Sequence, residues 1–187
     1  FCHVGFAQEG QPYVIPTIHA RLGDNLVFHG ATASRLLDQI QSGAEICVAI
    51  TLLDALVLAR SVCSHSMNYR SVVLFGKGRL ITDDQEKMRA LELLTDHLLP
   101  GRWCDARRPT QKELDATTVV SLSIESASAK IRTGPPMDDE EDYQLPVWAG
   151  LLPIRQQFLD AVNDPKLREG IPVPDYVVNS PRRRPTP

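Results

Sequence analysis

The chain has 187 residues, a formal net charge of −3 and a hydrophobic content of 43%. A chain of this size buries one sizeable core without disulfide or metal staples, and its slight negative charge gives no global attraction to nucleic acid or to anionic membranes. No apolar run reaches the length of about 18 residues that a transmembrane helix requires. We therefore expect neither nucleic-acid nor membrane partners.

The four cysteines are Cys2, Cys47, Cys63 and Cys104, and they show neither CxxC spacing nor pairing with histidine. Three of them adjoin apolar or aromatic residues, which favours buried, reduced thiols in a cytoplasmic protein over disulfides or a metal site. The chain opens at Phe1 with neither an initiator methionine nor a signal peptide, so we expect a trimmed native N-terminus.

Short strands open the chain. Residues 2–7 predict a buried strand, and a turn at 9–12 leads to a second strand at 13–19. Pro16 interrupts this second strand and removes one donor from the hydrogen-bond ladder. Two interpretations follow: the backbone of 15–17 contacts a flat ligand, or the segment is an edge strand with a kink.

A third predicted strand, 25–29, follows a hairpin turn at 22–25 and ends where a helical pattern begins. The junction contains one glycine, the hydroxyls of Thr32 and Ser34, and Arg35. Backbone N–H groups, short hydroxyls and a planar guanidinium are the groups that bind phosphate. The junction is either a phosphate site or an ordinary helix N-cap with Arg35 in solvent.

The middle of the chain holds the most apolar runs. Residues 46–58 predict a long central strand or a bent hairpin pair covered on both faces. Residues 61–70 are small, polar and aromatic and predict a loop, where functional groups collect on rigid sheets. A strand at 71–81 carries glycines that indicate a bend or bulge, and 83–99 shows helical spacing behind an acidic cap.

The last third of the chain mixes short elements. Thr110 and Glu113 have the spacing of a capping box that opens a short helix. Residues 118–132 alternate between apolar and polar and predict one half-exposed antiparallel strand. The remaining predicted elements are an acidic loop at 138–142, a last strand at 146–153, a helix at 155–169 and an extended tail.

Strands with glycine bends, and helices only at the crossovers, indicate a mainly β (α+β) fold built on a small curled antiparallel barrel of six to seven strands. We divide the chain into a barrel domain at 1–154 and a C-terminal helix with a Pro- and Arg-rich tail at 155–187. Long apolar strands with few helices to cover them leave an apolar face, which a two-fold interface would bury.

Over residues 2–153 the chain resembles the pyridoxamine 5'-phosphate oxidase-like flavin-binding proteins, the group that includes the nitroimidazole-resistance reductases. The resemblance implies a split β-barrel with peripheral helices that forms a homodimer and holds FMN in the cleft between its subunits. The segments that carry it are QPYVIPT (11–17), HGATASR (29–35), HSMNYRSV (65–72) with Gly76 following, and WAG (148–150).

The resemblance also assigns roles to residues. The strand at 14–17 lies along the isoalloxazine ring, the hydroxyls and guanidinium at 32–35 bind the FMN phosphate, and Trp148 covers the flavin from the partner subunit. Family members often carry lysine at the position of Thr32 or Arg35, so this chain lacks one cation of the usual pair. The implied cofactor-binding residues are Val14, Ile15, Pro16, Thr17, Thr32, Ser34, Arg35, Tyr69, Arg70, Ser71 and Trp148.

Flavin chemistry is supplied by the cofactor, so the motifs require no acid or base. His65 is the candidate catalytic residue because it lies beside flavin-facing residues in a predicted loop, and the alternative is a histidine that only stabilises the loop. The chain lacks the arginine and histidine set with which pyridoxamine phosphate oxidases bind their substrate's phosphate, which disfavours that activity.

Three functions compete at this point. The first is an FMN-dependent oxidoreductase for a small substrate, and the second is a flavin- or haem-binding protein without turnover. The third is a structural homodimer with an empty cleft. For haem, the candidate axial ligands are His3, His19, His29 and His65.

Overall fold

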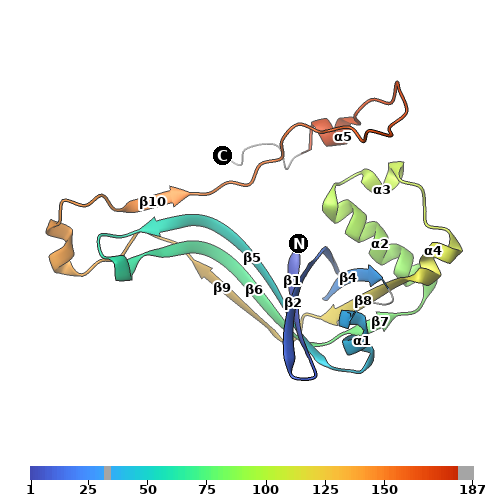
Figure 1. Cartoon of the computed structure of the whole chain (residues 1–187), viewed down its shortest axis with the longest axis horizontal. Coiled ribbons are helices and arrows are strands. Elements are labelled where there is room, and N and C mark those ends of the chain that lie inside the picture. The colour runs from blue at the N-terminus through green and yellow to red at the C-terminus, as the bar shows by residue number, and fades with distance from the viewer. Residues whose placement is uncertain (32–34, 181–187) are drawn as a thin grey trace.

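The computed structural model describes residues 1–31 and 35–180. It confirms an antiparallel split β-barrel with helices at the periphery (Figure 1). The described residues form ten strands, more than the expected six to seven, because several predicted strands are each divided in two.

The strands are β1 (Cys2–Gln8), β2 (Gln11–Thr17), β3 (His19–Leu22), β4 (Asn25–Ala31), β5 (Glu45–Leu58), β6 (Ser66–Lys77), β7 (Arg79–Ile81), β8 (Thr117–Ser123), β9 (Ala127–Arg132) and β10 (Gly150–Pro153). The helices are α1 (Arg35–Gln41), α2 (Asp84–Leu98), α3 (Arg102–Asp105), α4 (Gln111–Ala116) and α5 (Asp175–Val178), and the short 3-10 helices are η1 (Val62–Ser64) and η2 (Glu140–Gln144).

Two sheets make the barrel. One has the order β2-β1-β5-β6-β9, with β10 paired to the far part of β5, and the other has the order β3-β4-β8-β7. Alternate side chains of both sheets, with one face of α1, fill the space between them, as the period of two in a strand requires. The main core includes Val4, Phe28, Leu37, Val48, Val120 and Leu122.

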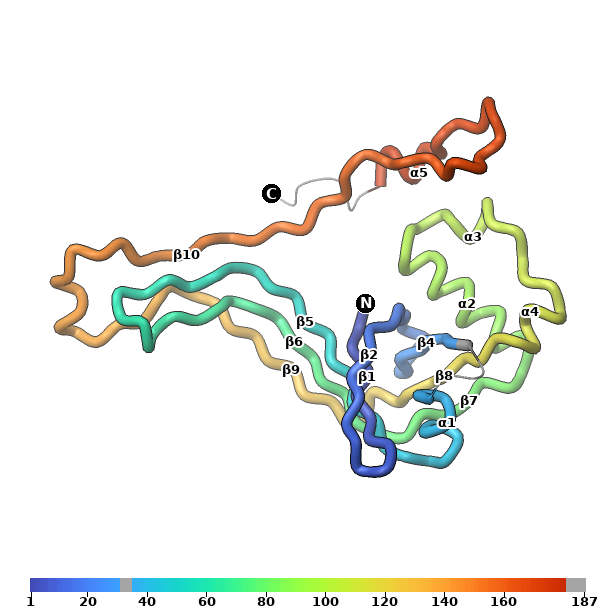
Figure 2. Tube along the Cα trace, viewed as in Figure 1, coloured from blue at the N-terminus to red at the C-terminus, as the bar shows by residue number. Residues whose placement is uncertain are grey.

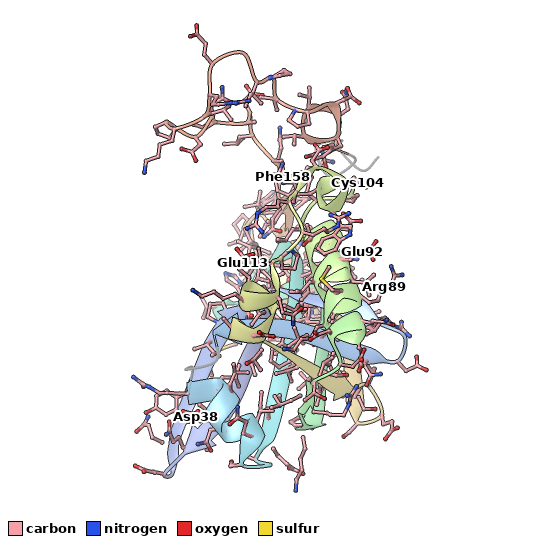
Figure 3. All side chains as sticks on the ribbon, turned by 90° about the vertical axis from the view of Figure 1, so that its right-hand side faces the viewer. Asp38, Arg89, Glu92, Cys104, Glu113 and Phe158 are labelled. Atoms are coloured by element: carbon pink, nitrogen blue, oxygen red, sulfur yellow. The ribbon has the colours of Figure 1, made fainter. Side chains whose placement is uncertain are left out.

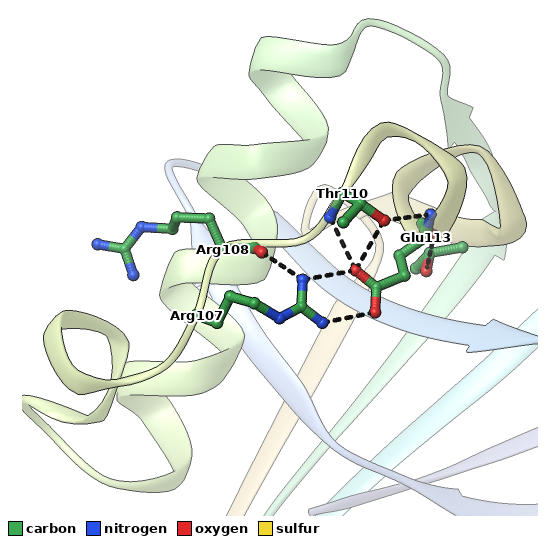
Figure 4. Close-up of polar contacts among 5 residues, drawn as sticks. Arg107, Arg108, Thr110 and Glu113 are labelled. Carbon is green, nitrogen blue, oxygen red and sulfur yellow. Dashed lines mark hydrogen bonds and ion pairs between the residues drawn. The ribbon is translucent and has the colours of Figure 1, made fainter.

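A helical cap of α2, α3 and α4 covers the outer face of the second sheet, where Ala90 and Leu94 join a second core. The predicted capping box of α4 is present: Thr110 accepts from the Glu113 N–H, and Glu113 reaches back to the Thr110 N–H (Figure 4). Arg107 adds two hydrogen bonds to the Glu113 carboxylate. These contacts lower the pKa of Glu113 to about 2, and the hydrogen bonds from Arg107 contribute most.

Strands β5 and β6 extend beyond the barrel. We call their distal halves, 51–58 and 66–72, together with β9 and β10, the arm; the arm projects to one side of the barrel (Figures 1 and 2). Much of the apolar surface of the arm is left uncovered by the described parts of the chain. The exposed apolar residues of the arm include Leu52, Leu53, Leu56, Met67, Ile131 and Leu152.

Residues 154–174, which we call the strap, run from β10 back towards the cap (Figure 1). At its far end, Tyr176 of α5 accepts a hydrogen bond from Arg102 in α3 at 3.1 Å. Phe158 of the strap borders a cavity of about 230 Å³ with Leu98 and Leu99 at the end of α2 (Figure 3). The strap thus connects the arm to the cap.

The expected helix at 155–169 is wrong, because the strap is extended there. Its apolar side chains Leu159 and Val162 are 79% and 94% exposed. A short helix in water depends on burying an apolar face, and these two side chains are left mostly uncovered by the described parts of the chain.

Several predicted strands cross between the sheets. The segment 13–19 divides into β2 and β3, 118–132 into β8 and β9, and each pair contributes to both sheets. The segment 71–81 divides at Gly78, where a Cβ atom would lie 2.9 Å from Val120. The alternation of apolar and polar residues continues where the chain crosses from one sheet to the other, so the sequence pattern does not reveal these crossings.

Two other boundaries were misplaced. The predicted loop at 61–70 is a loop only up to residue 65, because β6 begins at Ser66 and pairs along β5. The last strand, expected at 146–153, is confined to β10. No helix in the described ranges has the length and apolar character needed to cross a membrane.

The cysteines differ from one another. All four are free, and burial raises the pKa of the Cys2 thiol to about 11. Cys63 and Cys104 are exposed, so the expectation of buried thiols is wrong for these two. Both belong to one-turn helices at the surface, η1 and α3, where apolar sequence neighbours do not ensure burial.

Candidate functional site

The predicted ring-contacting strand lies at the edge of its sheet. Strand β2 pairs with β1 and with no other strand among the described residues. Its outer edge therefore keeps backbone donors and acceptors available, and Pro16 occupies a position that an edge tolerates. Val14 and Ile15 are 68% and 36% exposed, and Thr17, at the end of the strand, pairs with Cys2.

Arg35 lies beside this edge. It opens α1, and its guanidinium carbon is 5.4 Å from the centroid of the Tyr13 ring in β2. Tyr13 in turn stacks on Phe6 of β1, with ring centroids 5.3 Å apart. The structure thus brings the predicted phosphate-binding cation to the predicted flavin-contacting strand, whereas Thr32 and Ser34 lie outside the described residues.

A second group of predicted site residues lies on β6, where it leaves the barrel. Arg70 donates from Nε and Nη2 to the two carboxylate oxygens of Asp54, at 3.1 and 2.9 Å. These bonds raise the pKa of Arg70. Ser71 shares a hydrogen bond of 2.9 Å with Thr51 on β5, and Tyr69 is half-buried opposite Leu53.

Asp54 was not predicted as a site residue. The register between β5 and β6 shifts between Leu53 and Ala55, so Asp54 is the extra residue of a β-bulge. A bulge re-aims a side chain, and here the side chain meets Arg70. An aspartate within a run of apolar residues was the signal in the sequence that could have identified it.

Arg70 and Asp54 line a cavity of about 470 Å³ where the arm meets the barrel; we call it the junction pocket. Phe1, which precedes β1, reaches this pocket, so the pocket lies near the Thr17 end of β2. The first residues of the strap close another side. The lining residues are Phe1, Thr51, Leu52, Leu53, Asp54, Arg70, Ile154, Arg155 and Gln156.

His65 lies further out, at the tip of the arm, and its side chain is exposed. Its Nδ1 accepts a hydrogen bond from the Ala59 N–H at 3.2 Å. In the neutral ring this places the proton on Nε2, which has no hydrogen-bond partner in the described parts of the chain. His65 thus both stabilises its loop and presents an N–H to its surroundings.

A buried carboxylate fixes the tip of the arm. Asp138 accepts hydrogen bonds from the N–H groups of Arg60 and Ser61 and from the Arg60 guanidinium. Burial by itself raises the pKa of Asp138, and these hydrogen bonds outweigh burial, so the pKa lies below its ordinary value. The sequence places Asp138 only in an acidic surface loop, because its hydrogen-bond partners are distant in the chain.

Trp148 also lies at the arm tip. Its ring covers Gly150, where a Cβ atom would lie 2.9 Å from the ring, and Gly150 pairs with Leu58 on β5. The indole remains 67% exposed. The arm tip lies away from β2 and α1 (Figures 1 and 2), so the fold of the chain does not bring Trp148 and Arg35 together.

Comparison with known proteins agrees with the fold. The family model described as pyridoxamine 5'-phosphate oxidase matches residues 1–131. A solved structure of the flavocytochrome Anf3 from Azotobacter vinelandii is similar, with 44% sequence identity, a TM-score of 0.89, and coverage of 95% of this chain and 83% of that one. No curated protein matches the sequence.

Two further solved structures are similar. The FAD and heme binding protein from Mycobacterium smegmatis has 37% identity and a TM-score of 0.89, covering 95% of this chain and 87% of its own. A 5-nitroimidazole antibiotic resistance protein from Bacteroides thetaiotaomicron has 25% identity and a TM-score of 0.58, covering 68% of this chain and 74% of its own. From this match of sequence and fold, the chain belongs to the pyridoxamine 5'-phosphate oxidase family of flavin-binding split-barrel proteins.

Proposed function

We propose that this protein is a flavin-dependent oxidoreductase that acts on a small-molecule substrate or electron acceptor. The observation that carries the proposal is the position of Arg35 against Tyr13, beside the open edge of β2. An edge backbone suits the polar rim of an isoalloxazine ring, and a guanidinium suits the flavin phosphate. When bound, the flavin supplies the electron-transfer chemistry, and the chain orients the ring and substrate.

The proposed cofactor is FMN, as the sequence motifs imply. The similar protein from Mycobacterium smegmatis is named for FAD, which shares with FMN the isoalloxazine ring and the first phosphate. Arg35 and β2 suit that shared part and do not choose between the two. The mass of the cofactor released by denaturing the purified protein distinguishes FMN from FAD, and absence of any flavin would contradict the proposal.

Arg35→Ala tests the site. The substitution removes a charge-assisted contact to phosphate worth about 1.5–3 kcal/mol, so the flavin dissociation constant is expected to rise about ten- to a hundredfold with the fold intact. Fluorescence titration of the protein with FMN and FAD measures it. Arg21→Ala is the matched control, since Arg21 is an exposed cation on β3 paired with Asp24. An unchanged flavin dissociation constant in Arg35→Ala would mean that the phosphate binds elsewhere on the protein.

We further propose that the protein is a homodimer with the flavin at the subunit interface. Exposed apolar residues gather on the arm, and a two-fold interface would bury them. In that arrangement Trp148 at the arm tip covers the flavin of the partner subunit. Sedimentation at several concentrations, with and without flavin, tests this; a stable monomer that holds flavin stoichiometrically would contradict both the interface and the role of Trp148.

In the proposed site His65 orients the substrate by hydrogen bonding. Its Nε2–H is the donor that it presents at the surface of the arm. His65→Gln keeps a donor of similar reach and His65→Ala removes it. We expect a larger loss of kcat/KM in the alanine variant, with flavin content unchanged in both; equal, undiminished activity would leave His65 a loop-stabilising residue.

Haem binding is the second candidate function, because two similar proteins are named a flavocytochrome and a FAD and heme binding protein. Among the candidate ligands, His19 and His29 are desolvated, which lowers the pKa of each, whereas His65 presents Nε2. Ligation by Nε2 requires the proton to move to Nδ1 and the Ala59 contact to break. A Soret band lost in His65→Ala would support this function.

A further inference from the structure

We propose that a pocket in the helical cap binds a small organic ammonium ion, a primary amine carried on an apolar body. This cap pocket has a volume of about 500 Å³, within the range of about 300–1,000 Å³ typical of small-molecule sites. One wall is a face of α2, formed by residues 84, 85, 88, 89 and 92. The opposite wall is formed by Trp103, Pro109, Gln111 and Leu114. None of these residues belongs to the flavin site proposed above.

Polar contacts between the helices hold the two walls in place. The Gln111 side chain of α4 donates to the Asp84 carboxylate of α2 at 2.9 Å, and the Lys87 ammonium donates to a carbonyl of α4 at 3.1 Å. The Trp103 N–H of α3 donates to the Asp96 carboxylate of α2, also at 3.1 Å. The cap pocket is therefore already formed in the fold of the chain.

The charge of the cap pocket favours a cation. Its charged lining side chains are Asp84, Arg89 and Glu92. Arg89 and Glu92, both on α2 (Figure 3), form an ion pair at 2.7 Å, so their charges largely offset each other. Asp84 has no cationic side-chain partner in the described ranges, since its side-chain hydrogen bond comes from the neutral Gln111 amide. The lining thus carries one unbalanced negative charge.

Asp84 and Gln111 together present hydrogen-bond acceptors. Nε2 of Gln111 donates to Asp84 Oδ2 and to Asp115 Oδ1, both at 2.9 Å. This amide therefore uses both of its N–H donors on carboxylates, and its Oε1 remains as an acceptor. No described residue donates to Oδ1 of Asp84. An ammonium group has three N–H donors and no acceptor, so it matches these two oxygens.

The rest of the lining favours an apolar body on the ligand. Met88 and Trp103 are half-buried, and Leu114 is 5% exposed. Arg108 stacks on the Trp103 ring, with its guanidinium carbon 4.1 Å from the centroid, but it is not among the residues that line the pocket. A ring or short alkyl chain bound against Met88 and Trp103 would remove apolar surface from water, which a metal cation would leave uncovered.

The test follows the indole N–H signals of the isotope-labelled full-length protein by NMR. The chain has two tryptophans, so the indole signal that remains in Trp148→Phe identifies Trp103. Phenethylamine is the probe, and phenethyl alcohol is its neutral counterpart. We expect the amine to shift the Trp103 signal with a dissociation constant at least about threefold lower than that of the alcohol.

Asp84→Asn removes the unbalanced charge and keeps the shape of the side chain. It should weaken binding of the amine about three- to tenfold, a modest loss because Asp84 is exposed, and leave binding of the alcohol unchanged. Asp115→Asn is the matched control, because this exposed carboxylate accepts from the same Gln111 amide but does not line the pocket. Amine binding in the control should stay close to that of the parent protein.

An equal loss of amine binding in Asp84→Asn and Asp115→Asn would overturn the proposal, because it would show diffuse attraction by surface charge. Equal binding of the amine and the alcohol to the parent protein, or no shift with either, would also overturn it. Tighter binding of N-acetyl-lysine methylamide than of phenethylamine would overturn the assignment to a free amine, since it would indicate a lysine side chain of a partner protein.

Met88→Ser tests the apolar part of the cap pocket. The substitution removes apolar surface from the lining and leaves all of its charges in place. Binding of the amine and of the alcohol should weaken alike, by about two- to fivefold. Unchanged binding of both probes in this variant would overturn the apolar half of the proposal.

Discussion

Strands β5 and β6 run through both the barrel and the arm, yet only the barrel has a conventional buried core. In β5, Ile46 and Val48 are 2% and 0% exposed, whereas Leu52 and Leu53 further along are 47% and 40% exposed. The pairing with β6 continues along both parts of β5, with a register shift at the Asp54 bulge. What differs is that α1 and the second sheet cover the barrel half, and nothing in the described chain covers the arm in the same way.

This difference indicates that the two regions have different tasks. The barrel stabilises the fold by burial, and it positions β2 and Arg35. The arm is held by specific polar contacts, those of Asp54 with Arg70 and of Asp138 with Arg60, and it leaves apolar side chains exposed. Substitutions in the two regions should therefore change different measurements.

The largest effect is expected in the barrel. Phe28 is 1% exposed in the main core, so Phe28→Ala should lower the free energy of unfolding by about 3–5 kcal/mol, through lost burial and the cavity left behind. Chemical denaturation measures it. Phe158→Ala in the strap, where the ring is 52% exposed, is the comparison. Similar losses in the two variants would abolish the distinction between barrel and strap.

The next effect concerns assembly. Ile131 on β9 is 68% exposed on the arm. Ile131→Asp should weaken the proposed dimer at least about tenfold while changing the unfolding of the monomer by only about 0.5 kcal/mol. Sedimentation of the sample measures the strength of the dimer, and denaturation of the same sample measures the unfolding of the monomer. Ser128→Asp, on the opposite face of β9, controls for added charge; an equal effect there would argue against an interface on the Ile131 face.

A pH dependence of the folding stability is expected from His19, where the barrel contacts the cap. Burial, and next the nearby His97, lower the pKa of His19 from 6.5 to about 4. Between these values the unfolded state binds a proton that the folded state does not, so stability falls as pH falls through this window and is level on either side. We expect a loss of about 1 kcal/mol, reduced from the full shift because the ring is half-exposed.

Replacing His19 with asparagine removes the titrating group. The free energy of unfolding, measured between pH 7.5 and 4, should then depend less steeply on pH than in the parent protein. His3→Asn, at an exposed position of β1, is the control. An unchanged slope in His19→Asn would show that other groups, such as His29, whose pKa is also lowered, govern the acid response.

The smallest effect is expected in the cap. Thr110→Ala removes the hydroxyl that accepts from the Glu113 N–H and should cost about 0.5–1 kcal/mol, typical of a lost N-cap. Thermal denaturation measures this cost, with Thr95→Ala as a comparison, since the Thr95 hydroxyl in the last turn of α2 donates to the Leu91 carbonyl. A cost well above that of the comparison supports the capping role, and equal costs contradict it.

The sequence by itself determined the barrel's strands, the long helix behind Asp83, the capping box and the family motifs. These features depend on local periodicity and on side chains that form hydrogen bonds to near neighbours in the chain, so they can be identified from the sequence alone. Glycine bends likewise marked the curvature of the sheets.

Only the tertiary structure decided where alternating runs cross between sheets, that Asp54 faces Arg70, and that residues 155–169 are extended. Asp138 and Arg60 are 78 positions apart, so no local pattern relates them. The helical spacing of Phe158, Leu159 and Val162 predicts a helix only if a surface exists to receive that face. Whether one exists depends on the packing of the whole molecule, because burial, unlike periodicity, is not a property of a segment.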